Sequence, residues 1–106
     1  MPKYLISGSY TAEGAKGVLK DGGTKRYQVA EAAIKSAGGK MEALYFAFGG
    51  TDIYAIVDAP DQATILAASL AINASGAVQL NTTVLITPAE LDAATKKSVT
   101  YRPPGS

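Results

Sequence analysis

The sequence predicts one α+β domain in which an antiparallel sheet carries helices on one face, the ferredoxin-like plait. Three observations support this prediction. The 106 residues suit a single domain, taken here as residues 1–106. The 47% hydrophobic and 18% charged residues are typical of a globular chain. The expected elements follow the order β-α-β-β-α-β, with a split first helix and an extra C-terminal helix, and this order folds most simply as a plait.

A strand and a broken helix are expected at the start of the chain. Residues 3–10 alternate between two sets of side chains in the manner of a strand. Thr11 is a suitable N-cap for the helix that follows. The segment 21–23, Asp-Gly-Gly, interrupts the helical pattern because glycine favours helix ends. We therefore expect two helical pieces, over 12–20 and 25–37.

A hairpin and a second helix are expected in the middle of the chain. Residues 40–48 and 52–58 are predicted as strands, joined by a tight turn over 49–51. That turn reads Gly-Gly-Thr, and glycine adopts the positive φ that hairpin turns require. Asp61 follows a proline and is a natural N-cap, so a helix is expected over 62–74.

The last part of the chain is expected to form a strand, a helix and an extended tail. Residues 78–87 are predicted as the fourth strand. Pro88 suits the first turn of a helix over 88–97, in which acidic residues come early and lysines late, as the helix dipole favours. The tail 101–106 contains two prolines and is expected to be extended.

Both faces of the predicted sheet are largely apolar. In the second strand the side chains expected to meet the helices are Leu44, Phe46 and Phe48, and the opposite set is Met41, Ala43, Tyr45 and Ala47. In the third strand the two sets are Ile53, Ala55 and Val57 on one side and Tyr54 and Ile56 on the other. One chain covers only one face with helices, so the pattern predicts a homo-oligomer formed through the open sheet face. The alternative is that the split first helix or the last helix folds over that face.

The composition excludes several classes of chemistry. The chain has no cysteine and no histidine. Disulfides, thiolate nucleophiles, zinc sites, histidine-ligated haem and Ser-His-Asp catalysis are therefore excluded within this chain, and no metal site or cofactor is expected. The net charge of +1 argues against nucleic acid as a partner. No apolar stretch is long enough for a membrane span, and no signal region follows the N-terminus, so a cytoplasmic location is expected.

Several short motifs, in order along the chain, resemble those of the GYD domain family. They are Tyr4-Leu5-Ile6, Tyr10-Thr11-Ala12-Glu13-Gly14, Phe48-Gly49-Gly50-Thr51-Asp52-Ile53-Tyr54, Ile56-Val57-Asp58-Ala59-Pro60-Asp61, Asn73-Ala74-Ser75-Gly76 and Thr82-Thr83. The sequence departs from the family at the naming triplet, where Thr51 stands in place of tyrosine. The resemblance implies a small bacterial protein of ferredoxin-like type with no settled activity. The chain is also similar to dimeric α-β barrel proteins, which implies two sheets packed face to face.

One cluster of residues is a candidate for acid–base catalysis. Pairing of the second and third strands would place Asp52, Tyr54 and Tyr45 on one sheet face. A carboxylate beside phenols in a pocket is a candidate for proton transfer. The alternative is that Asp52 helps to form the turn and that the tyrosines pack in an interface.

Two other groups are candidates for ligand binding. Lys25 and Arg26 begin the second helical piece, whose free amides could hold an anion. Ser7, Ser9 and Tyr10 end the first strand and offer hydroxyl groups to a polar ligand. The alternatives are a helix break with a cap for the first group and cross-strand hydrogen bonds for the second.

Three functions are compatible with the sequence. The first is a homo-oligomeric module that binds a small molecule or a protein. The second is a cofactor-free enzyme of the α-β barrel type, an isomerase or a monooxygenase, which would need a closed cavity containing Asp52. The third is a structural subunit of a larger assembly.

Overall fold

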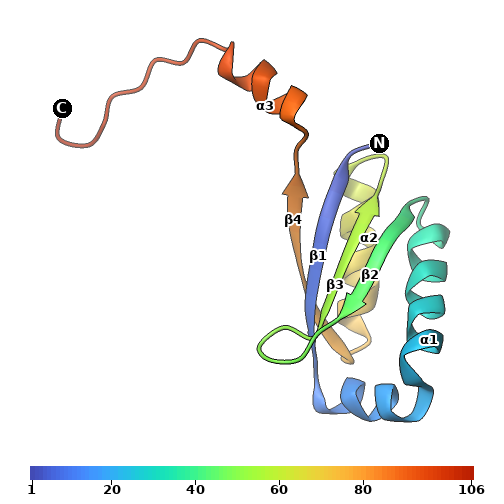
Figure 1. The fold of residues 1–106 in the computed structure, drawn as a ribbon. Helices are drawn as coiled ribbons and strands as arrows, with labels where there is room; N and C mark the ends of the chain where they lie inside the picture. Colours follow the sequence, from blue (N-terminus) through green and yellow to red (C-terminus); the bar gives the residue numbers. More distant parts are fainter.

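The computed structural model describes residues 1–106 as four strands and three helices (Figure 1). The sheet has the strand order β2-β3-β1-β4, with every neighbouring pair antiparallel. This α+β architecture is compatible with the predicted ferredoxin-like plait. The elements are β1 (Lys3–Tyr10), α1 (Ala12–Ser36), β2 (Lys40–Phe46), β3 (Ile53–Asp58), α2 (Gln62–Ala74), β4 (Val78–Leu85) and α3 (Pro88–Thr95).

Helix α1 is broken at the expected glycine segment. Gly22 has φ 78° and ψ 172°, which lies outside the helical region. Glycine adopts this conformation without strain because it has no Cβ. The two pieces of α1 run in different directions in Figure 1: the first crosses the end of the sheet, and the second runs along it. The prediction of a split first helix is therefore confirmed.

Side-chain caps hold the starts of all three helices, and those at Thr11 and Asp61 were predicted. The side chain of Thr11 accepts a hydrogen bond from the Gly14 amide at 3.2 Å, and Asp61 accepts one from the Thr64 amide at 2.8 Å. Thr87 and Glu90 form a capping box at the start of α3, where each side chain bonds the other residue's amide at 3.1 Å. These bonds satisfy amides that helix geometry leaves without partners.

The core lies between the helices and one face of the sheet. Tyr4 and Ile6 of β1 and Val57 of β3 are buried on this face, together with Ile34 of α1. The expected division of β3 is confirmed, since Ala55 and Val57 are buried and Tyr54 is 42% exposed. The cluster of nine buried residues is Tyr4, Ile6, Ile34, Met41, Ala55, Val57, Ala59, Ile65 and Ala68.

Strand β2 departs from the expected alternation. Met41 was expected opposite the helices, but it is only 6% exposed and belongs to the core. The pairing of β2 with β3 shifts between Met41 and Ala43, which places Met41 and Leu44 on the same face. A bulge of this kind moves one side chain to the other face of the sheet.

The hairpin loop is longer than the predicted three-residue turn. β2 ends at Phe46 and β3 begins at Ile53, so residues 47–52 form the loop. Phe48, which was expected to face the helices, is fully exposed within it. The loop is closed by the Ala47 amide, which donates to the Asp52 carbonyl at 2.7 Å. Strand β4 likewise ends two residues earlier than expected, at Leu85.

The start of α1 lies very close to the loop before β4. A Cβ atom on Gly14 would lie 1.8 Å from the carbonyl oxygen of Ala77, whereas a Cβ on Gly17 would meet nothing within 4 Å. The Thr11 amide donates to the same Ala77 carbonyl at 3.0 Å. Only glycine at position 14 permits this approach.

The helices leave one sheet face uncovered, which we call the open face. Opposite residues in an antiparallel pair share a face, so Ala43, Ile56, Leu5 and Thr83 form one row across the four strands. A second row contains Tyr45, Tyr54, Ser7 and Asn81. No part of the chain packs over this face in Figure 1. The alternative in which α1 or α3 covers it is therefore wrong for the single chain.

The last 21 residues extend away from the domain, and we call residues 86–106 the C-terminal arm. The arm consists of a short connector, α3 and an extended tail (Figure 1). Every residue of the arm is exposed. The radius of gyration is 17.0 Å, whereas a compact domain of this length has about 13 Å. None of the three helices has the length and hydropathy that a membrane span requires.

Candidate functional site

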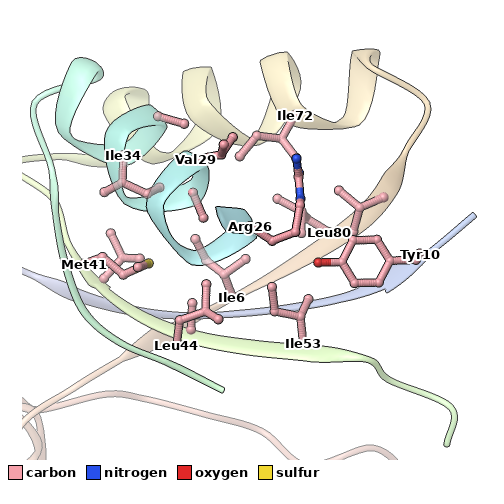
Figure 2. A pocket seen from close by; sticks show the side chains of 15 residues that line it. Ile6, Tyr10, Arg26, Val29, Ile34, Met41, Leu44, Ile53, Ile72 and Leu80 are labelled. Atoms are coloured by element: carbon pink, nitrogen blue, oxygen red, sulfur yellow. The ribbon is translucent and has the colours of Figure 1, made fainter. Parts of the chain in front are cut away.

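A cavity of about 110 Å³ lies between the helices and the covered face of the sheet (Figure 2). Fourteen of its 15 lining residues are hydrophobic. They come from both α1 and α2 and from all four strands. The lining residues are Ile6, Tyr10, Arg26, Val29, Ala30, Ala33, Ile34, Met41, Leu44, Ile53, Ala55, Val57, Ile72, Val78 and Leu80.

The cavity follows from the placement of the two helices. Helix α1 packs mainly on β2 and α2 packs mainly on β4, so the helices lie over opposite edges of the sheet. The central strands β1 and β3 lie beneath the space between them. On α1, the facing residues recur at helical spacing from Arg26 through Ala30 and Ala33 to Ile34. The small alanines leave volume that larger side chains would fill.

The cavity contains one charged side chain, that of Arg26. Figure 2 shows Arg26 reaching from α1 towards the side of the cavity where Tyr10 and Ile72 lie. Its side chain is 29% exposed, and its Nη1 lies 3.7 Å from the Asp21 carboxylate. A guanidinium is protonated throughout the physiological pH range and presents several donors in a plane. Arg26 therefore brings a guanidinium, paired at its outer side with Asp21, to an otherwise apolar site.

The Tyr10 hydroxyl is the second polar group of the cavity, and it points inward in Figure 2. Burial raises the pKa of Tyr10 above its usual value, and the negative charge of Asp52 acts in the same direction. The positive charge of Arg26 opposes both effects. The phenol therefore stays protonated at neutral pH and is able to donate a hydrogen bond.

Asp52 holds Tyr10 in place from outside the cavity. Its carboxylate accepts a hydrogen bond of 2.9 Å from the Tyr10 backbone amide. The Asp52 amide in turn donates to the Gly8 carbonyl at 2.9 Å. These two bonds tie the hairpin loop to the end of β1, where Tyr10 begins the turn into α1.

The candidate catalytic residues are only partly brought together. Tyr45 and Tyr54 are directly opposite each other on β2 and β3, and they are 73% and 42% exposed on the open face. The Asp52 carboxylate is instead bonded to the Tyr10 amide. None of the three residues lines the cavity.

The candidate ligand-binding residues divide between two sides of the sheet. Tyr10 and Arg26 meet at the cavity. Ser7 lies on the open face, and the Ser9 hydroxyl donates to the Gly50 carbonyl at 2.8 Å. Lys25 is 65% exposed and lies 3.9 Å from Asp21, outside the cavity.

The cavity itself was not anticipated from the sequence. On the second helical piece Val29, Ala30, Ala33 and Ile34 form an apolar stripe along the cavity, whereas Arg26 was predicted only as an anion ligand at a helix start. Arg26 stands three residues before Val29 and therefore extends the same stripe. A charged residue within an apolar helical stripe is the sequence feature from which a binding site on this face could have been predicted.

The arrangement suits binding of a small molecule with an apolar body and an anionic end. Apolar cavities of comparable size hold small hydrocarbons, and a guanidinium is a strong donor to carboxylates. No group of three or more Asp or Glu side chains converges in the structure as a possible metal site.

The comparisons with known proteins agree with the motifs. Neither the curated proteins nor the solved structures gave a significant match. The comparison with protein families matches the GYD domain over residues 4–95, which covers all strands and helices of the structure except the first residue of β1. The chain therefore belongs to the GYD domain family.

Proposed function

We propose that this GYD domain protein is a homo-oligomeric module that binds a small carboxylic acid in the cavity between its helices and its sheet. The observation that carries this proposal is the pair of Arg26 and Tyr10, which bring the only polar side-chain groups to an otherwise apolar lining. The lining would receive the apolar body of the ligand. The guanidinium and the phenol would hold its carboxylate.

The size and polarity of the cavity define the class of ligand. The volume of about 110 Å³ is of the order of the apolar cavity of about 150 Å³ that binds benzene, so it matches the apolar body of a small acid. A larger or strongly polar molecule would leave its polar groups without partners among the aliphatic side chains. A charge-assisted hydrogen bond contributes about 1.5–3 kcal/mol, which makes Arg26 the main source of preference for an acid.

The geometry favours binding over catalysis. The enzyme hypothesis needs Asp52 inside a cavity, and its carboxylate is engaged by the Tyr10 amide outside the lining. Tyr45 and Tyr54 lie on the opposite side of the sheet from the cavity. No acid–base pair adjoins the volume where a ligand would lie.

Self-association through the open face is part of the proposal. Leu5, Ala43 and Ile56 form an apolar row across that face, and Tyr54 and Tyr45 lie beside it. Sheets with one face in water usually carry polar side chains there. A second copy with the same row is a self-complementary cover.

The binding proposal is tested by titrating the ¹⁵N-labelled protein with benzoate, and with benzyl alcohol as a neutral probe of similar size. We expect amide shifts at the cavity residues with both probes and tighter binding of benzoate. Arg26→Met should weaken benzoate at least about tenfold and leave benzyl alcohol nearly unchanged. Lys25→Met is the matched control, because Lys25 is the neighbouring cation outside the cavity.

The outcomes separate the possibilities clearly. Equal loss of benzoate affinity in Arg26→Met and Lys25→Met would show that benzoate is attracted by the positive charge of this region in general. It would contradict specific binding of the carboxylate by Arg26. The absence of cavity shifts with both probes would refute the proposed function.

A further inference from the structure

We infer that the C-terminal arm of one copy packs on a second copy of this chain, with Leu91 and Tyr101 as its apolar anchors. This inference rests on the proposed self-association and adds to it a contact that the open face does not supply. In the single chain, Leu91 is 53% exposed and Tyr101 is 72% exposed.

The arm contains a well-formed helix that packs on nothing in its own chain. Helix α3 has eight residues and a capping box, but no buried residue. Isolated helices of this length are marginal in water, because nucleation is unfavourable and the few hydrogen bonds of a short helix do not offset it. Most helical stability comes instead from packing of an apolar face. A capped helix without any packing therefore indicates a partner surface outside its own chain.

The connector directs the arm away from its own domain. Only Ile86 and Thr87 separate β4 from α3. Pro88 has a fixed φ at the first helical turn, and the capping box fixes the backbone between Thr87 and Glu90. The resulting path leads away from the sheet in Figure 1.

The area of the open face indicates that the arm is needed for a stable dimer. Four strands about 4.8 Å apart and about 24 Å long cover roughly 450 Å². A stable interface buries about 800 Å² on each partner. The flat footprint of the open face is therefore small for a stable interface formed by this face alone. An exchanged arm of 21 exposed residues from each copy supplies surface of the required order.

A second copy of this chain is the partner that fits both of its unpacked surfaces. Each copy has an uncovered sheet face and an arm without a surface to pack on. In a two-fold dimer each copy gives one arm and receives one. The same symmetric interface therefore covers the open face and gives each arm a surface to pack on. The large exposed apolar side chains of the arm are Ile86, Leu91, Val99 and Tyr101.

The first test compares full-length variants by sedimentation equilibrium. Leu91→Gln combined with Tyr101→Gln removes both anchors and keeps a good helix former in α3. We expect the dissociation constant of the dimer to rise at least about tenfold. Asp92→Asn combined with Arg102→Gln is the matched control, because it changes the neighbouring polar residues, and it should leave the constant unchanged.

The second test places the arm directly, and the absence of native cysteine makes it simple. A Ser98→Cys variant carrying a nitroxide, without ¹⁵N, is mixed with ¹⁵N-labelled protein without a nitroxide. We expect broadening of amide signals in the ¹⁵N-labelled copy, since the arm of one subunit lies on the other. Broadening seen only when both labels are on the same chain would overturn the inference.

The outcomes distinguish failure of the arm contact from failure of the proposed function. A dimer that persists unchanged in the Leu91 and Tyr101 variant would overturn the arm contact and leave self-association through the open face standing. A full-length monomer at all concentrations would overturn both. Binding of benzoate in the cavity is measured independently of either result.

Discussion

The carboxylate of Asp52 accepts a hydrogen bond of 2.9 Å from the backbone amide of Tyr10, and this bond joins the hairpin loop to the residue that lines the cavity. The bond gives Asp52 a positioning role. Asp52→Ala should lower the free energy of unfolding by about 1–3 kcal/mol, because the amide loses its partner. Asp52→Asn should retain most of the stability, since its amide oxygen can still accept. Urea denaturation checks both, and equal losses in the two variants would contradict this role.

Gly14 and Gly17 provide a matched pair on the first piece of α1. Gly14→Ala should cost about 3 kcal/mol or more, because its Cβ would lie 1.8 Å from the Ala77 carbonyl oxygen. Gly17→Ala should instead stabilise the protein by about 0.5–1 kcal/mol, since it faces open space and alanine favours the helix. Thermal and urea unfolding measure both changes. Similar effects at the two positions would contradict the close approach of α1 to the Ala77 loop.

The pKa of Asp58 should depend on Lys3. Lys3 Nζ lies 2.9 Å from Asp58 and 2.7 Å from Glu42, and the hydrogen bond from Lys3 holds the pKa of Asp58 below its usual value. A depressed carboxyl pKa contributes stability that is present above about pH 4 and is lost as the pH falls through the folded value. Lys3→Met should raise the pKa of Asp58, measured by ¹³C NMR of the carboxyl group. Lys16→Met, an exposed cation on α1, is the control and should leave that pKa unchanged.

The raised pKa of Tyr10 predicts a loss of stability in alkali. Because the folded pKa lies above the unfolded value of about 10, the folded state binds this proton more tightly. The contribution is complete below about pH 10 and disappears as the pH rises through the folded value. Tyr10→Phe should therefore show a shallower fall in unfolding free energy between pH 9 and about pH 11. Tyr45→Phe is the control at an exposed phenol, and the same change in slope there would contradict the assignment to Tyr10.

Local signals account for what the sequence predicted correctly. The caps at Thr11 and Asp61 and the break at Gly22 depend on a few neighbouring residues, so the chain encodes them locally. The antiparallel sheet followed from the order of the elements. The faces of β3 followed from its alternation, which no bulge interrupts.

The errors arise where distant parts of the chain decide the outcome. Met41 enters the core because β2 shifts its register against β3, and no local pattern announces that shift. Phe48 is exposed because β2 ends at Phe46 and residues 47–52 form a loop, which Asp52 ties to the end of β1. The cavity depends on how far apart α1 and α2 lie on the sheet. Tyr10 and Arg26 were both recognised as candidate ligands, but only the fold brings them to one site.

The isoleucine methyl groups provide the most direct test of the cavity as a binding site. Ile6, Ile34, Ile53 and Ile72 line the cavity, whereas Ile56 lies on the open face and Ile86 lies in the arm. In a ¹H–¹³C spectrum of the methyl-labelled protein, titration with benzoate should shift the four cavity methyl signals and leave those of Ile56 and Ile86 in place. Shifts confined to Ile56 and Ile86, or no shifts at all, would contradict the central claim that this family member binds a small carboxylic acid between its helices and its sheet.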